Sequence, residues 1–481
     1  MTSDLFLGFD VGTQGTKALL VDVDACTVVA RAASAYDLLP GLAPGAAEQH
    51  PETWWSAVRE CARSLAKSAD LRAVRAVGVS GQQHGFVALD ERKGVIRPAK
   101  LWCDTSTAAE ARELTQVLGR HVPTGFTASK ILWLKRHEPH HFARLAHVLL
   151  PHDWINWMLC GELAMEAGDA SGTALFDPVT RKFDARACYA IDERLEATLP
   201  GLLAPDEPAG RLKGDAAREL GLPAGIPVAP GGGDNMCAAI GAGATRPGVA
   251  VLSLGTSATV FAYSRTPVLD PEGLIAPFCD SSGGYLPLLC VMNATGVLHE
   301  VARAFPGEDL ESLTRAAERV PPGSDGLLFL PYLQGERVPD LPEATGTLLG
   351  LRPGFFDAGH LFRAALEGVS LNLAWGVERL RALGLTLDSV RLVGGGARNA
   401  LWASILADCL GARVQRLAET ESAALGAALQ AAWIVRRGAL DELVQRFVSI
   451  DGPPFEPDAA RKRFYRESLA RFRAAVQRAH A

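Results

Sequence analysis

Apolar runs that end at glycine-rich turns recur along the chain and predict alternating strands and helices. Residues 5–11 and 18–22 are expected to form two strands, because the turn between them, 12–17, contains two glycines and suits a tight hairpin. Residues 249–262 repeat the pattern of strand, Gly-Thr turn and strand. The repetition predicts an internal duplication whose two halves face each other across a cleft.

Two other apolar runs end in three consecutive glycines and then continue as helices. Residues 228–240 pass three glycines, present Asp234 and Asn235, and become a helix of small residues. Residues 390–399 end in the same way before a second helix. Glycines admit close approach of a ligand to the backbone, and a helix N-terminus favours anions. Asp234 is therefore either a general base or a helix cap, and the 390–399 segment either binds a nucleotide or only packs closely, with Asn399 as the cap.

Further helices are predicted from the spacing of apolar residues at 51–65 and 360–380. Residues 422–435 form another predicted helix, whose small side chains suit close packing, and we assign it no chemistry. Residues 169–173 are expected to form a loop, and the charged tail beyond 451 a surface helix.

Composition indicates the class of protein. The 481 residues are 48% hydrophobic and 21% charged, which is typical of a globular protein with sizeable cores. A net charge of −6 argues against nucleic acid or an anionic membrane as partner, and no apolar run approaches the roughly 18 residues of a membrane span. The nine cysteines are dispersed without zinc-site spacing, and no signal peptide precedes the first strand. We expect a cytoplasmic protein with two domains, 1–245 and 246–481.

The first hairpin carries groups that suit a phosphate and a metal ion. Its turn contains Thr13, Gln14 and Lys17, and it offers backbone N–H groups, hydroxyls and a cation. Asp10, at the end of the preceding strand, could hold hydrated Mg²⁺, which needs few protein carboxylates. An ordinary hairpin without a ligand is the alternative.

Alignment of the two hairpins places Gly255 and Thr256 on the Gly-Thr pair of the first turn, and Ser253 opposite Asp10. Phosphates are therefore expected between the two turns. Only the first half carries a carboxylate at this point, so metal binding is expected to be asymmetric.

Two other segments suit a polyol. Gln83 and His84 follow an apolar strand beside glycines, where they could hydrogen-bond hydroxyls, although a buried and internally satisfied His84 is the alternative. Trp102 and Asp104 combine an aromatic plate with a carboxylate, a mixture found in ligand pockets. The alternative is that Trp102 fills the core while Asp104 lies in a solvated turn.

With these motifs in this order, the chain resembles the FGGY carbohydrate kinases from residue 5 to about residue 432, and the segments 125–137 and 346–367 also match family patterns. The resemblance implies an α/β fold of two ribonuclease-H-like (actin/hexokinase-type) domains, with ATP and sugar in the interdomain cleft. It implies MgATP-dependent phosphorylation of D-xylulose to D-xylulose 5-phosphate. The alternatives are a kinase for another ketopentose or polyol, such as ribulose, and a non-catalytic ATP- or sugar-binding regulator on the same fold. The expected partners are the small-molecule sugar and ATP, with no nucleic acid and no membrane, and a homodimer is left open.

The resemblance also implies roles for individual residues. Asp234 would act as the base that takes the proton of the sugar hydroxyl. The remaining expected sites are sugar contacts at Gln83, His84, Trp102, Asp104 and Asn235, a metal site at Asp10, phosphate contacts at Thr13, Gln14, Lys17, Gly255 and Thr256, and an adenosine segment at Gly395, Gly396 and Asn399.

Three positions near the expected sugar pocket depart from the family pattern. Family members that act on xylulose commonly carry Met at the position of Gln83, Asn at that of Cys103 and Arg at that of Ser106. These departures bear on the choice of sugar more than on the reaction. We interpret the 125–137 segment, in contrast, as structural.

Overall fold

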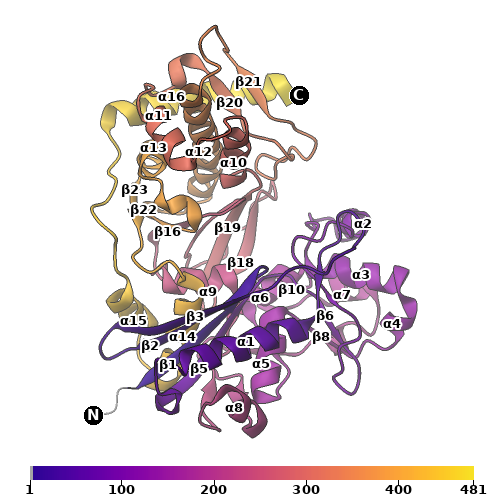
Figure 1. The fold of residues 1–481 in the computed structure, drawn as a ribbon. Coiled ribbons are helices and arrows are strands. Elements are labelled where there is room, and N and C mark those ends of the chain that lie inside the picture. The colour runs from indigo at the N-terminus through magenta and orange to yellow at the C-terminus, as the bar shows by residue number, and fades with distance from the viewer. Residues whose placement is uncertain (1–3, 481) are drawn as a thin grey trace.

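Two mixed β-sheets organise the computed structural model, which describes residues 4–480. In Figure 1 the sheet from the first part of the chain lies in the lower lobe, and the sheet from the second part lies in the upper lobe. A smaller group of helices that includes α2, α3, α4 and α7 stands beside the lower lobe.

The first sheet is built around the hairpin β1–β2, whose strand β1 also pairs in parallel with β5. A short strand, β15 (Gly232–Gly233), pairs with the end of β5. The sheet runs in the order β13 (Gly210–Arg211), β14 (Pro227–Val228), β5 (Val74–Gly81), β1 (Leu5–Val11), β2 (Gly15–Asp22) and β3 (Thr27–Ala35).

The second sheet repeats this arrangement around the hairpin β16–β17, whose strand β16 pairs in parallel with β22. It runs in the order β18 (Ile275–Cys279), β19 (Tyr285–Val291), β17 (Ala258–Ala262), β16 (Gly248–Leu254), β22 (Leu387–Val393) and β23 (Arg413–Arg416). The register places Asp10 opposite Ser80 in one sheet and Ser253 opposite Val393 in the other. The expected α/β class and the repeated hairpins are thus confirmed.

Helices cover both sheets. Those of the lower lobe are α1 (Pro51–Leu65), α5 (Pro151–Cys160), α8 (Gly214–Leu220), α9 (Asp234–Gly241), α14 (Ser422–Arg436) and α15 (Leu440–Phe447). Those beside it are α2 (Ala108–Leu118), α3 (Thr127–His137), α4 (Pro139–Ala143) and α7 (Ala185–Ile191), with the strands β6 (Val87–Leu89) and β8 (His147–Leu149). Those of the upper lobe are α10 (Thr295–Arg303), α11 (Leu310–Glu318), α12 (Ala358–Ala382), α13 (Ala400–Leu410) and α16 (Ala459–His480), with the strands β20 (Leu328–Leu330) and β21 (Thr347–Leu349).

Strand β1 is buried on both faces, so its side chains alternate between two cores. Leu7 and Phe9 pack in the core that contains α1, whereas Phe6 packs in the core that contains α14. Gly8 permits the close approach of α14, because a Cβ there would lie 2.1 Å from the carbonyl oxygen of Ala424. The small-residue helix predicted at 422–435 therefore packs as expected, and it does so against the first sheet although it comes from the second half of the chain.

Helix α9 lies between the two sheets. Ile240 packs in the α14 core of the first sheet, while Met236 and Ala239 pack with Val251 and Phe261 of the second. The first turn of α9 consequently emerges where the two lobes meet.

Two local predictions were wrong. Residues 169–173 are helical, because the Glu166 carboxylate accepts hydrogen bonds from the N–H groups of Gly168 and Asp169 and thereby starts a short helix, α6 (Ala167–Ala170). The tail helix α16 is not confined to the surface, since Tyr465 and Phe472 are buried in the core of the upper lobe. The domain boundary at residues 245 and 246 stays a prediction.

Within residues 4–480, no helix is both long enough and apolar enough to span a membrane.

Candidate active site

A cleft of about 1480 Å³ opens between the lobes and is lined by residues of both. It brings together several of the predicted site residues. These are Gln83, His84, Trp102, Asp234 and Asn235 from the first half of the chain and Gly255 from the second.

Asp234 is the first residue of α9, and Gly233 precedes it as the N-cap in an extended conformation. Its Oδ1 accepts hydrogen bonds from the Asn235 backbone N–H at 2.8 Å and from Asn235 Nδ2 at 3.0 Å. Burial, reinforced by the negative charge of Asp10, raises the pKa of Asp234 to about 7. A carboxylate with this pKa is suited to exchange a proton near neutral pH.

Asn235 connects Gln83 with the second sheet. Its Nδ2 donates to Gln83 Oε1 at 2.9 Å, and its Oδ1 accepts from Thr259 Oγ1 on β17 at 3.2 Å. Gln83 Nε2 is buried and has no hydrogen-bond partner within residues 4–480. Because an unsatisfied buried donor is costly, this amide is a candidate for bonding a hydroxyl of a ligand in the cleft.

His84 has a left-handed backbone conformation, with φ at 63°, and its ring makes two close contacts. Its ring stacks on Phe126 with centroids 4.2 Å apart, and Nδ1 lies 2.8 Å from the carbonyl oxygen of Gly172. Burial lowers the pKa of His84 to about 3, so the ring is neutral. Since a carbonyl oxygen can only accept, Nδ1 carries the proton and Nε2 is left as an acceptor.

Thr13 connects the first hairpin with Trp102. Trp102 Nε1 donates to Thr13 Oγ1 at 2.9 Å, and the hydroxyl donates onward to Gln82 Oε1 at 3.1 Å. Asp10, on the same hairpin, accepts from Ser80 Oγ at 2.8 Å, and burial raises its pKa to about 6. The structure therefore places the Trp102 indole beside the first Gly-Thr turn, and the predicted phosphate and sugar contacts of these residues stay predictions.

Lys17 and Gln14 are exposed at the hairpin. The Lys17 ammonium pairs with Glu421 at 2.6 Å, at the start of α14. Its predicted contact with a phosphate stays a prediction and would compete with this ion pair.

The second hairpin turn is fastened to the start of α10. The Gly255 carbonyl oxygen accepts from the Thr295 N–H at 2.9 Å and from Thr295 Oγ1 at 2.7 Å. Thr256 is exposed at the tip of the turn. The phosphate contact predicted at Gly255 and Thr256 stays a prediction.

The glycines after β22 lie against this second turn. A Cβ at Gly396 would lie 2.8 Å from the Leu254 Cβ, while Gly395 faces open space. Asn399 caps α13, because its Oδ1 accepts from the Trp402 N–H at 3.0 Å. The cap interpretation of Asn399 is correct, and a nucleotide contact at Gly395, Gly396 and Asn399 stays a prediction.

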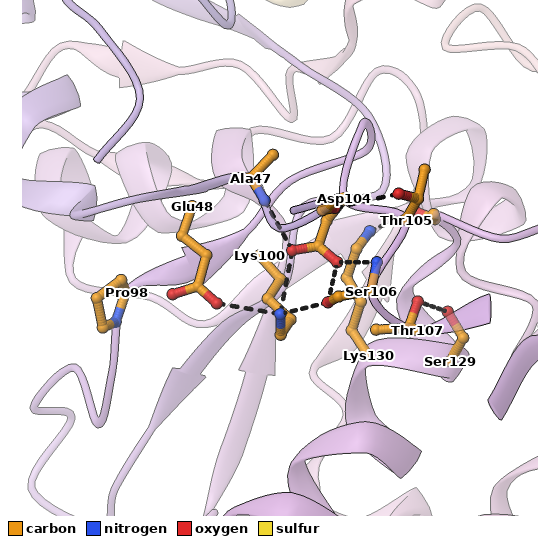
Figure 2. A network of polar contacts seen from close by, with 12 residues as sticks. Ala47, Glu48, Pro98, Lys100, Asp104, Thr105, Ser106, Thr107, Ser129 and Lys130 are labelled. Carbon is orange, nitrogen blue, oxygen red and sulfur yellow. Dashed lines mark hydrogen bonds and ion pairs between the residues drawn. The ribbon is translucent and has the colours of Figure 1, made fainter. Parts of the chain in front are cut away.

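Asp104 is fully buried and does not line the cleft, and Figure 2 shows the polar network around its carboxylate. Its Oδ2 accepts from the Ala47 N–H at 2.9 Å and from Lys100 Nζ at 3.0 Å. Its Oδ1 accepts from the N–H of Ser106 at 3.0 Å and from Ser106 Oγ at 2.5 Å. Both oxygens are therefore engaged in holding the turn after Trp102, and their burial argues against direct contact with a sugar.

Two polar residues at the site escaped the sequence analysis. Ser80 bonds Asp10, and its place could have been inferred by pairing two strands that each end in a polar residue. Thr259 bonds Asn235 across the lobes, and no local pattern distinguishes it from the other polar residues of β17.

Comparison with known proteins assigns the family. Residues 5–241 match the N-terminal domain of the FGGY family of carbohydrate kinases, and residues 250–435 match its C-terminal domain. The chain is 37% identical over 465 residues to a xylulose kinase of Haemophilus influenzae, covering 93% of this chain and 94% of that protein. It is 39% identical over 468 residues to a xylulose kinase of Streptomyces coelicolor, covering 93% and 92%. The crystal structure of xylulose kinase from Rhodospirillum rubrum superposes with a TM-score of 0.90 at 30% identity, covering 99% of each chain.

The repeated ribonuclease-H-like lobes, the cleft between them and both family matches lead to one conclusion: this chain belongs to the FGGY family of carbohydrate kinases.

Proposed function

We propose that the protein transfers the γ-phosphoryl group of ATP to the terminal hydroxyl of D-xylulose and releases D-xylulose 5-phosphate. The observation that carries this proposal is the place of Asp234, at the first turn of a helix packed between the two sheets and facing the cleft. The named relatives support the choice of sugar, since each is called a xylulose kinase.

In the proposed mechanism the residues mainly align the reactants and balance charge, as phosphoryl transfer requires. The carboxylate of Asp234 takes the proton of the attacking hydroxyl. Asn235 holds that carboxylate through Nδ2 and joins it to the opposite lobe through Thr259. Gln83 Nε2 donates to a sugar oxygen, and the neutral His84 ring accepts from a sugar hydroxyl through Nε2.

The two Gly-Thr turns are proposed to hold the phosphates of ATP, and the glycines after β22 its adenosine. Asp10 would bind the Mg²⁺ of MgATP, which supplies positive charge to the phosphates. The donor set fits this ion: Asp10 offers one carboxylate near the end of β1, beside the first Gly-Thr turn, and Mg²⁺ in nucleotide sites uses one or two carboxylates plus phosphates and water.

The sugar is tested by measuring ATP consumption against a panel of D-xylulose, D-ribulose, L-ribulose and glycerol. We expect kcat/KM to be highest for D-xylulose. A higher kcat/KM for ribulose would change the proposed substrate but not the proposed phosphoryl transfer. ATP binding without turnover on any sugar or polyol would favour a non-catalytic regulator.

The proposed setting is the cytoplasm, where ATP is supplied, and all nine cysteines are free. The homodimer is also a proposal, and light scattering after size-exclusion chromatography tests it.

A further inference from the structure

Lys130 is a buried lysine in a segment that the sequence analysis interpreted as structural. It lies on α3 and has no measurable exposure. Within residues 4–480 its ammonium forms no ion pair and instead donates to two backbone carbonyl oxygens, those of His84 at 2.6 Å and of Gly125. A buried ammonium without a carboxylate partner is costly, so its contacts need an explanation.

Both carbonyls belong to the wall of the cleft. His84 lines it in a left-handed conformation that non-glycine residues seldom adopt. Gly125 precedes Phe126, whose ring stacks on the His84 ring. Lys130 therefore binds the backbone of His84 and the backbone next to Phe126, and so holds both residues of the stacked pair.

Gly125, whose carbonyl oxygen Lys130 binds, also lies next to Trp102. Gly125 lies directly against Trp102, because a Cβ at Gly125 would lie 2.3 Å from the Trp102 carbonyl oxygen. Trp102 in turn donates to Thr13 of the first hairpin. Figure 2 shows the Lys130 side chain rising from its helix beside Asp104, whose network holds the turn after Trp102.

The two contacts of Lys130 do not depend on its charge, because the ammonium and the neutral amine both carry at least two N–H donors. Burial lowers the pKa of Lys130 to about 7, while the negative charge of Asp104 opposes that shift. An ordinary structural position in an apolar core would favour an uncharged side chain, as at Ile131 and Leu134 of the same helix.

We propose that Lys130 is a positioning residue for the sugar: by holding the carbonyls of His84 and Gly125 it fixes the His84–Phe126 pair and the adjoining Trp102 plate against the cleft. It touches neither substrate. The inference rests on the proposed sugar-kinase function and assigns a role that lies behind the proposed sugar site.

The test is the effect of Lys130→Met on each substrate separately. Methionine keeps most of the volume and removes the donors, so KM for D-xylulose should rise roughly ten- to a hundredfold, with KM for ATP changed less than about twofold. Lys135→Met is the matched control. Lys135 lies on the same helix and also donates to a backbone carbonyl, that of Ile191, but it does not line the cleft. Its variant should retain both KM values.

A second variant covers the case in which Lys130→Met does not fold, as judged by thermal unfolding. Thr127 Oγ1 donates to the same His84 carbonyl at 3.2 Å, so Thr127→Val should raise KM for the sugar about two- to fivefold without affecting that for ATP. An unchanged sugar KM in a folded Lys130→Met variant would overturn the proposal, and so would equal changes in both KM values. If Lys130→Met does not fold, an unchanged sugar KM in Thr127→Val would overturn it.

The proposed function and the proposed role of Lys130 fail in different ways. If the wild type phosphorylates another sugar of the panel, the same measurements are made with that sugar. If it phosphorylates none, the proposed function is wrong. In that case binding of D-xylulose by calorimetry replaces KM, and the same expected changes and contradicting outcomes then apply to Kd.

Discussion

Thr259 and Asn235 join the two lobes at the site, with Thr259 Oγ1 donating to Asn235 Oδ1 at 3.2 Å. Asn235 follows the proposed base directly, and its Nδ2 donates to Gln83 Oε1 and to Asp234 Oδ1. The position of the base is therefore coupled to a strand of the opposite lobe. Motion between the lobes would therefore shift the carboxylate of Asp234.

Removal of this hydrogen bond should impair the reaction more than the fold. Thr259→Val keeps the shape of the side chain, and we expect kcat/KM for the sugar to fall about three- to tenfold, since one neutral hydrogen bond is lost. Thr198→Val, which removes a hydroxyl that donates to Leu195 away from the cleft, serves as control. Equal kcat/KM values for the two variants would show that the contact is dispensable.

Asp234→Asn tests the base directly. The amide keeps the size of the side chain but cannot take a proton, so kcat should fall by roughly 10²–10⁴-fold. The Kd for ATP, measured by calorimetry, should stay within about twofold of the wild-type value, because the proposed nucleotide contacts lie at the Gly-Thr turns and after β22 rather than at Asp234. Turnover close to that of the wild type would remove Asp234 from the mechanism.

The activity should depend on pH in a direction fixed by two raised pKa values. Asp234, with a pKa of about 7, acts in its ionised form, so kcat/KM should rise with pH and level off above about 7. Asp10, with a pKa of about 6, must also be ionised to bind a cation, so the decline should steepen below about 6. Since the two carboxylates interact, the measured values belong to the pair. A flat profile between pH 5.5 and 8.5 would contradict both assignments.

The sequence predicted those parts of the site that depend on local pattern. The Gly-Thr hairpins and the start of a helix at Asp234 follow from glycines and apolar runs that are close in sequence. The contacts made by α14 could not be predicted in this way. Its small side chains indicate close packing, but the partner is a sheet formed about four hundred residues earlier, as the contact of Gly8 with Ala424 shows.

Trp102 and Asp104 show that local sequence pattern is also insufficient to predict where polar residues lie. They are two residues apart in sequence, yet Trp102 lines the cleft whereas Asp104 is buried and does not. The Asp104 carboxylate is held in its buried position by Lys100, which pairs with both Asp104 and Glu48. No spacing rule indicates that a lysine four residues earlier would pair with that carboxylate and also with a glutamate of the distant strand β4 (Glu48–Gln49).

The ion pair between Lys17 and Glu421 allows the phosphate role of Lys17 to be tested. If the ammonium also binds ATP, Lys17→Met should raise KM for ATP about three- to tenfold, whereas Glu421→Gln should lower it because a competing carboxylate is removed. Neither change should alter the free energy of unfolding by more than about 1 kcal/mol, since the pair is partly exposed. Opposite shifts in KM for ATP support phosphate binding, and an unchanged KM in both variants assigns Lys17 to the ion pair alone.

Lys100 should prove essential for stability in a way that exposed lysines are not. Its ammonium lies within 3.0 Å of both Glu48 and Asp104 and stands 4.0 Å from the centroid of the Trp133 ring. Lys100→Met leaves the buried Asp104 carboxylate without its cation, whereas Glu48 keeps its ion pair with Arg97. The free energy of unfolding should therefore fall by about 3–5 kcal/mol in urea titrations.

Lys213→Met is the matched control, because Lys213 pairs with Asp215 at 3.8 Å on the surface. Its loss should cost no more than about 1 kcal/mol. Equal stability of the two variants would contradict the prediction and show that the buried Asp104 carboxylate does not depend on Lys100.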